Sequence, residues 1–213
     1  MKTLQVIKVE TPDQIKQYQS LYEREARLPL AAEYIEKVDA FLIFKAEILI
    51  AAYCLNNGEK VPFRYLSIFT DKAKAMVLSS PYPIEEDSFM EIAAIVMTDE
   101  SSRKDHNLCY AKIATHANNY AFKHDKTRIL GGSVIPKIQQ MQFELMPHLL
   151  YKASIDSSLK IVNNADGMVM LYYATRNEFM LRAMFLLCKK QIKAVFLSKK
   201  PKTKEPLPRK TAA

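Results

Sequence analysis

The sequence has no tryptophan, only four glycines and only three cysteines among its 213 residues. No apolar run approaches the length of about 20 residues that a transmembrane helix needs, so we expect no membrane span. The first residues, MKTLQVIKVETPDQ, contain no long apolar core, and we expect no signal peptide. The cysteines are odd in number and lie in apolar segments, which predicts reduced core residues of a cytoplasmic protein: Cys54, Cys109 and Cys188.

Several signatures of enzyme classes are also missing. The sequence has no P-loop, no dinucleotide-binding fingerprint, no Gly-x-Ser-x-Gly elbow and no His-Glu-x-x-His motif. The four histidines have no metal-binding spacing relative to cysteines or carboxylates, so we expect neither a metal site nor a tightly bound cofactor.

The basic charge is confined to one end of the chain. The net charge is +8, and the stretch from Lys189 onward has nine basic residues against one acidic residue. Residues 1–188 are therefore neutral, with 22 charges of each sign. The lack of a net basic charge in this part disfavours nucleic-acid binding by it, and binding through the tail alone is a further alternative.

Alternating strand and helix patterns predict a mixed-sheet α/β fold. Residues 1–198 form one predicted domain, and residues 199–213 form a predicted disordered basic tail. Thr11 with Gln14, and Thr175 with Glu178, have the spacing of helix-capping boxes. The expected strands are 6–10, a hairpin of 41–44 and 48–55, a short strand at 63–69, then 89–97, 128–135 and 167–174. The expected helices are 11–27, 108–124, one from Pro136 that Pro147 kinks or splits, and 176–197, although 179–187 could also form a strand.

A single acidic residue, Glu91, interrupts the most apolar strand, FMEIAAIVM. A buried carboxylate without partners costs several kcal/mol. Glu91 must therefore face a cleft, a partner or solvent. In a cleft, partial burial would raise the pKa of its carboxyl group. The alternatives are an exposed strand face and a structural ion pair.

Gly131 and Gly132 stand side by side in the apolar stretch RILGGSVI. Glycine weakens a strand, and it usually marks a β-bulge or the close approach of a ligand or another backbone. The sequence leaves both explanations open.

The layout of residues 40–152 resembles the Gcn5-related N-acetyltransferase (GNAT) fold. Within it, the nearest resemblance is to the branch of acyl-homoserine-lactone synthases and long-chain N-acyl amino acid synthases. The shared features are a hairpin, a long loop, a central strand with an internal glutamate, a polar loop, and then helix, strand and helix. The resemblance implies an α/β (α+β) fold with a mixed, splayed central β-sheet flanked by helices.

The resemblance also implies an activity, namely N-acyl transfer to a small amine. The donor would be an acyl carrier protein (acyl-ACP) or acyl-CoA thioester, whose pantetheine arm enters the gap between the splayed strands. Glu91 would bind or deprotonate the amine, and Tyr151 would protonate the leaving thiolate. The alternative for Tyr151 is a half-buried core residue. The residues implied in donor binding are Ile95, Val96, Met97, Arg103, Lys104, Gly131, Gly132, Ser133 and Val134.

This sequence departs from the branch at several positions. Ala93 and Ala94 replace a Ser-Arg pair, and Cys54 replaces an arginine of the second hairpin strand. Residues 98–107 contain no glycine, whereas acetyl-CoA-dependent members have a glycine-rich pyrophosphate loop. Arg103 and Lys104 could still hold a single phosphate at the helix start, or they could belong to a solvated loop. These departures favour the second hypothesis, a non-catalytic binding module on the same scaffold.

The predicted C-terminal helix mixes apolar and basic residues. Such a helix could lie on an anionic membrane, which would make the cytoplasmic protein peripheral to it. An acidic acyl carrier protein could instead bind the basic end. The third possibility is a core-packing helix followed by a solubilising tail. The apolar residues are Phe179, Met180, Met184, Leu187, Ile192 and Phe196, and the basic ones are Arg182, Lys189, Lys190 and Lys193.

Overall fold

The computed structural model describes residues 4–66, 71–79, 85–98, 102–133, 136–154 and 168–198. The predicted basic tail lies outside these ranges. The elements, in chain order, are β1 (Leu4–Lys8), α1 (Pro12–Ala26), α2 (Ala32–Lys37), β2 (Asp39–Lys45), β3 (Ile48–Asn56), α3 (Asp71–Ser79), the short 3-10 helix η2 (Glu86–Ser88), β4 (Phe89–Met97), α4 (Arg103–Lys123), β5 (Arg128–Ser133), α5 (Pro136–Leu145), β6 (His148–Ser154), β7 (Met168–Thr175) and α6 (Arg176–Ser198).

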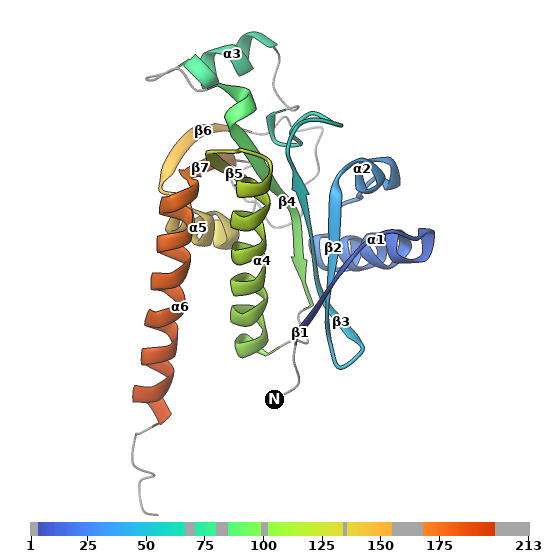
Figure 1. The fold of residues 1–213 in the computed structure, drawn as a ribbon, viewed down its shortest axis with the longest axis vertical. Coiled ribbons are helices and arrows are strands. Elements are labelled where there is room, and N and C mark those ends of the chain that lie inside the picture. The colour runs from blue at the N-terminus through green and yellow to red at the C-terminus, as the bar shows by residue number, and fades with distance from the viewer. Residues whose placement is uncertain are drawn as a thin grey trace, which may run out of the picture.

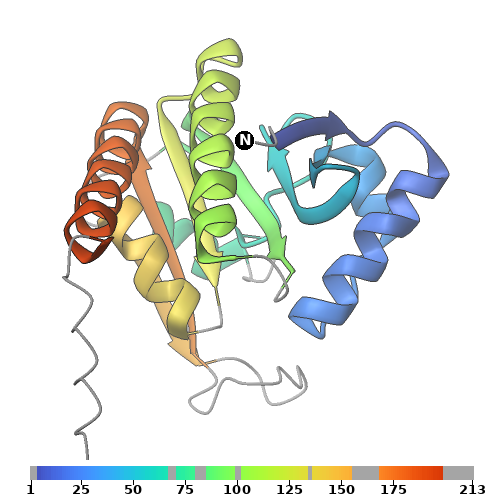
Figure 2. The ribbon, with the colours of Figure 1, turned by 90° about the horizontal axis from the view of Figure 1, so that it is seen from below.

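One mixed sheet of seven strands organises the molecule, in the order β1-β2-β3-β4-β5-β7-β6 (Figure 1). The β4–β5 pair is parallel and the other neighbouring pairs are antiparallel. Helices α4 and α6 pack on one face of the sheet, and α1 and α2 pack on the other (Figure 2). The predicted mixed α/β fold is confirmed.

Both predicted capping boxes are present. The Thr11 hydroxyl accepts from the Gln14 N–H (3.3 Å), and the Gln14 side-chain oxygen accepts from the Thr11 N–H (3.0 Å). Thr175 and Glu178 repeat this exchange at the start of α6, at 2.9 and 3.2 Å. Residues 179–187 are therefore helical, and the strand alternative is wrong.

Four elements were not predicted: α2, α3, η2 and β6. Helix α5 ends at Leu145 because the residue before Pro147 is disfavoured in the helical region. The chain then forms β6, which pairs with β7, and Tyr151 lies on this strand and not at the end of a helix. The expected strand at 63–69 is also wrong over its described part, since residues 63–66 are not extended.

Two expectations about burial and membrane crossing can be compared with the structure. Cys54 and Cys109 are buried, but Cys188 is exposed on α6, so the prediction of a core residue is wrong for that cysteine. Among the helices that the structure describes, none is long and apolar enough to cross a bilayer.

The central strand separates from its parallel neighbour. β4 pairs with β5 only over Phe89–Glu91, and beyond this point the two strands diverge. The register between β3 and β4 also shifts, and Ala94 has a left-handed φ of 49°. The Tyr18 hydroxyl of α1 donates to the Ala94 carbonyl (2.7 Å), which fixes this bulge. The splayed sheet implied by the resemblance is therefore present.

The β2–β3 turn provides a test of the backbone geometry. Ala46 and Glu47 are exposed and both have positive φ, 49° and 70°. Glycine adopts this conformation without steric strain, so Glu47→Gly should raise the free energy of unfolding by about 0.5–1 kcal/mol. The same replacement at exposed Glu23, inside α1, should lower it by about 1 kcal/mol. Urea denaturation measures both values, and a loss of stability in Glu47→Gly would contradict the turn geometry.

Candidate functional site

The Glu91 side chain is completely buried, at 0% exposure, on the face of the sheet that α1 and α2 cover. Its two oxygens accept hydrogen bonds from the backbone N–H groups of Tyr65 (2.7 Å) and Arg64 (2.9 Å). The Tyr34 hydroxyl lies 3.5 Å away, at the outer limit of a hydrogen bond. The exposed-face alternative for Glu91 is therefore wrong. Both backbone donors belong to residues 57–66, hereafter the 57–66 segment.

Burial changes the acidity of this carboxyl group. Removal from water raises the pKa of Glu91 to about 7, although the N–H groups of Tyr65 and Arg64 and the Arg64 guanidinium act in the opposite direction. The carboxylate is thus protonated in a substantial fraction of molecules near neutral pH. A general base works best when its pKa lies near the working pH.

Arg64 and a group of tyrosines surround the carboxylate. The Arg64 guanidinium lies 5.5 Å from the ring centroid of Tyr22 and 5.7 Å from that of Tyr34, within the range of cation–π contacts. Burial is the main cause that raises the pKa of Tyr34 and Tyr65 well above 10, so both phenols stay protonated at neutral pH. The site therefore combines one titrating carboxyl group, one cation and neutral hydroxyl groups.

The sequence did not point to Arg64 or to these tyrosines. Tyr18 and Tyr22 lie four residues apart, which places them on one face of α1, but nothing local connects that face with Glu91. Arg64 lies in a turn and belongs to no helix or strand. Only the folded chain shows that these residues meet.

Cys54, Ala93 and Ala94 replace the polar residues of the resembled branch, and all three are buried. Cys54 lies opposite Ala93 in the β3–β4 ladder, and its sulfur donates to the Tyr18 hydroxyl (3.2 Å). These positions are thus part of the packing between the sheet and α1. The cation beside Glu91 comes instead from Arg64, on the 57–66 segment.

The glycine pair allows side chains to pack closely on both faces of β5. A Cβ atom on Gly131 would lie 2.5 Å from the Met146 methyl group, and one on Gly132 would lie 2.6 Å from Leu171 and 2.8 Å from the Tyr65 ring. The register between β5 and β7 continues without a shift, so the β-bulge explanation is wrong.

The two predicted walls of the gap lie on the diverging strands. Val96 is buried and Ile95 and Met97 are half-buried, all beyond the last β4–β5 pair. On β5, the carbonyl groups of Gly132 and Ser133 accept from the side chains of Gln142 (3.0 Å) and Gln139 (2.9 Å). Contact of these walls with an acyl donor stays a prediction, and Val134 lies outside the described residues.

The start of α4 holds an acidic side chain. Ser102 caps the helix by accepting from the Asp105 N–H (3.2 Å), and Asp105 forms an ion pair with Lys45 at 2.8 Å. The hydrogen bonds from Lys45 and Ser102 lower the pKa of Asp105, so its negative charge persists. This charge works against phosphate binding at the same helix end. Lys104 is exposed, and the side chain of Arg103 lies outside the part of the structure that can be described.

Tyr151 does not lie beside Glu91. It packs half-buried against the cluster that contains Phe63, Phe89 and Leu130, on the same face of the sheet as Glu91. Strands β5 and β7 lie between its strand and β4. At the usual spacing of about 4.8 Å between strands, the backbones of Tyr151 and Glu91 are at least about 14 Å apart. The structure therefore supports the core alternative for Tyr151 better than the catalytic one.

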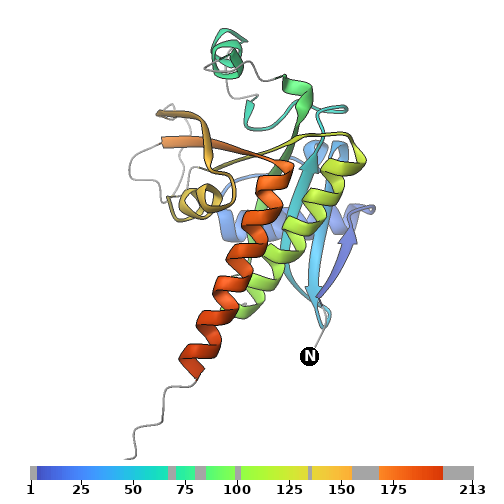
Figure 3. The ribbon, with the colours of Figure 1, turned by 60° about the vertical axis from the view of Figure 1, so that its left-hand side comes forward.

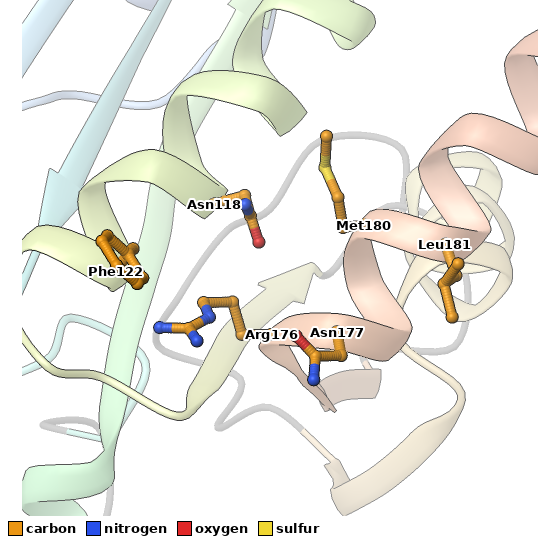
Figure 4. A pocket seen from close by; sticks show the side chains of 6 residues that line it. All are labelled: Asn118, Phe122, Arg176, Asn177, Met180 and Leu181. Carbon is orange, nitrogen blue, oxygen red and sulfur yellow. The ribbon is translucent and has the colours of Figure 1, made fainter.

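A depression on the opposite face of the sheet lies between α4 and α6. It is lined by Asn118, Phe122, Arg176, Asn177, Met180 and Leu181 (Figure 4). None of these residues belongs to the Glu91 site. Among the residues that the structure describes, no cluster of histidine, cysteine and acidic side chains could hold a metal ion.

No protein-family model and no curated protein matches the sequence. Solved structures do match it. The N-acyl amino acid synthase FeeM from uncultured soil microbes superposes with a TM-score of 0.60 at 12% identity, over 87% of this chain and 99% of its own. The AHL synthase LasI gives 0.54 at 11% identity, over 86% and 95%. The IAA acetyltransferase from Bacillus cereus ATCC 14579 gives 0.52 at 13% identity, over 81% and 99%. Likenesses at such low identities show a shared fold.

The two glycines should differ in their tolerance of alanine. Gly131→Ala meets the flexible end of Met146, which can move, so we expect a loss of less than about 1 kcal/mol in the free energy of unfolding. Gly132→Ala meets the Tyr65 ring, whose backbone is held by Glu91, and we expect a loss of about 1–3 kcal/mol. Each variant is the control for the other in chemical denaturation. Equal losses would contradict the packing described for Gly132.

Glu91 should make stability depend on pH. The pKa of Glu91 is raised from 4.5 to about 7 on folding, so its protonation stabilises the folded state. This contribution to the free energy of unfolding is complete below about pH 4.5 and is lost as the pH rises through about 7. The loss should be on the order of 3 kcal/mol. Urea denaturation between pH 4.5 and 8 measures it. Glu91→Gln should have a lower free energy of unfolding than the wild type, but it should lack the pH-dependent contribution of Glu91. Glu85→Gln, at an exposed position, should retain that contribution. A wild-type profile that matches that of Glu91→Gln would contradict the raised pKa.

Proposed function

From the GNAT fold of this chain, we propose that it is an N-acyltransferase that moves an acyl group from a thioester to an amine. The observation that carries the proposal is the position of Glu91. This carboxyl group, with a pKa of about 7, lies at the last paired residue before β4 separates from β5. The names of the structural neighbours, which include an N-acyl amino acid synthase and an acetyltransferase, support the same class of reaction.

The donor would enter the gap between the diverging strands. Residues 95–97 of β4 and 131–133 of β5 would form its walls, and the edge of β4 that has left β5 would pair with the amides of a pantetheine arm. An acyl carrier protein fits better than CoA because residues 98–107 lack glycine and Asp105 places a negative charge at the start of α4. Either donor agrees with a cytoplasmic location.

In the proposed reaction, the amine nitrogen attacks the thioester carbonyl carbon. The carbon–sulfur bond then breaks, and the amide forms as the nitrogen loses a proton to the Glu91 carboxylate. The protonated Glu91 then gives this proton to the leaving thiolate, directly or through water, and Glu91 returns to its charged form. Because Arg64 and Tyr65 cover the carboxylate, the 57–66 segment has to move before an amine can reach it.

A second candidate is a non-catalytic binding module on the same scaffold. The observation that favours it is that both Glu91 oxygens already accept backbone hydrogen bonds. A carboxylate in this arrangement can act as a structural anchor for the 57–66 segment. The two candidates differ in whether the protonation of Glu91 affects a reaction rate or only the free energy of unfolding.

Expression in a bacterium, followed by mass spectrometry of lipid extracts, tests the proposal. We expect N-acylated species that are absent from cells carrying the empty vector, and their masses would identify the acyl group and the amine. With these substrates, the rate of the purified enzyme should rise with pH through about 7, as Glu91 loses its proton.

Glu91→Gln should lower that rate by about 100- to 10,000-fold, the usual contribution of a general base. Glu85→Gln, at an exposed position, should have no effect on the rate. If Glu91→Gln kept the wild-type rate and pH profile at a temperature at which it is folded, the catalytic role of Glu91 would be wrong. If no species formed with a panel of amines and both donor classes, the binding module would be the better explanation.

A further inference from the structure

Helix α6 exposes large apolar side chains along one side. Leu181, Met184 and Phe185 are 67%, 54% and 66% exposed, and their spacing of three and four residues places them on one face. We call these three residues the α6 outer face. Phe179 and Ala183, at 1% and 5% exposure, form the inner face that packs on the sheet side of the molecule. Phe179 was expected among the membrane-facing residues, and that expectation is wrong.

The apolar surface continues onto the neighbouring helix. Phe122 of α4 is 67% exposed, and the Arg176 guanidinium lies 4.9 Å from the centroid of its ring. Phe122 and Leu181 line the same depression between the two helices (Figure 4). Exposed apolar side chains of two adjacent helices thus line one depression together with Arg176.

The surplus positive charge of the chain lies in the second half of α6 and in the residues that follow this helix. Residues 189–213, which begin within α6, have nine basic residues against one acidic residue, whereas the preceding 188 residues are neutral. The last turns of α6 extend beyond the end of α4 and beyond the sheet (Figure 3). Ile192 and Phe196 continue the spacing of the α6 outer face in the sequence.

A second copy of this chain does not fit this surface, because its approach would bring two segments of charge +8 together. An anionic lipid surface fits both features: its headgroups attract the lysines, and its acyl-chain boundary receives the exposed apolar side chains of the helix. We infer that α6 binds anionic lipid bilayers, with the α6 outer face inserted at the interface and the basic residues 189–213 against the headgroups. The inference is independent of the proposed acyl transfer.

Vesicle flotation with the purified full chain tests this inference. One set of vesicles contains phosphatidylcholine alone, and the other contains 30% phosphatidylglycerol. We expect binding to the anionic vesicles that is at least tenfold tighter than to the neutral ones and that weakens as salt is raised. Leu181→Glu combined with Phe185→Glu should weaken anionic-vesicle binding at least tenfold, with the circular dichroism and melting temperature unchanged.

Ile48→Glu is the matched control, because Ile48 is 66% exposed but lies on the β2–β3 hairpin, away from α6. It should bind anionic vesicles like the wild type. The inference is overturned if neutral and anionic vesicles bind equally, or if the double variant binds like the wild type. It is also overturned if neither vesicle binds, and in that case binding to an acidic acyl carrier protein, measured with the same variants, would identify the alternative partner of this face.

Discussion

The burial of one carboxylate in the central strand is the constraint on which the site depends. An unpaired Glu91 would cost several kcal/mol, so the fold has to bring donors to it. The 57–66 segment supplies two backbone N–H groups, and their hydrogen bonds fix this irregular stretch across β4. The position of the segment in turn places the Tyr65 ring over β5, where only glycine at position 132 leaves space for it. One electrostatic requirement thus connects two strands and a loop.

The same burial gives Glu91 two properties that compete with each other. Desolvation raises its pKa towards neutrality, while the N–H groups of Arg64 and Tyr65 stabilise the charged form and attach the segment to β4. A carboxylate that is held more firmly would be a weaker base. One that is held less firmly would leave the segment unattached. The pKa of about 7 therefore reflects the balance between desolvation and the groups that stabilise the carboxylate.

Local signals predicted much of this fold. The capping boxes at Thr11 and Thr175 were visible as short patterns, and so were the apolar central strand and the hairpin, because each depends on neighbouring residues. Strand β6 depends on pairing with β7 across a long connection, which no local pattern records. Glu91 could be identified as unusual from its apolar surroundings. Its partner Arg64 could not, because only the tertiary fold brings residue 64 to residue 91.

The bulge at Ala94 has a consequence for how the central strand should be interpreted. Ala93, Ala94 and Val96 face α1 and α2, whereas Ile92, Ile95 and Met97 face the α4 side. If Ala94 were deleted, simple alternation would still place each of the remaining residues of the strand on its present face. The alternation of faces therefore does not require this residue, whose left-handed backbone costs about 1–2 kcal/mol. The bulge lies in the part of β4 that no longer pairs with β5, and the Ala94 carbonyl group there accepts from the Tyr18 hydroxyl of α1.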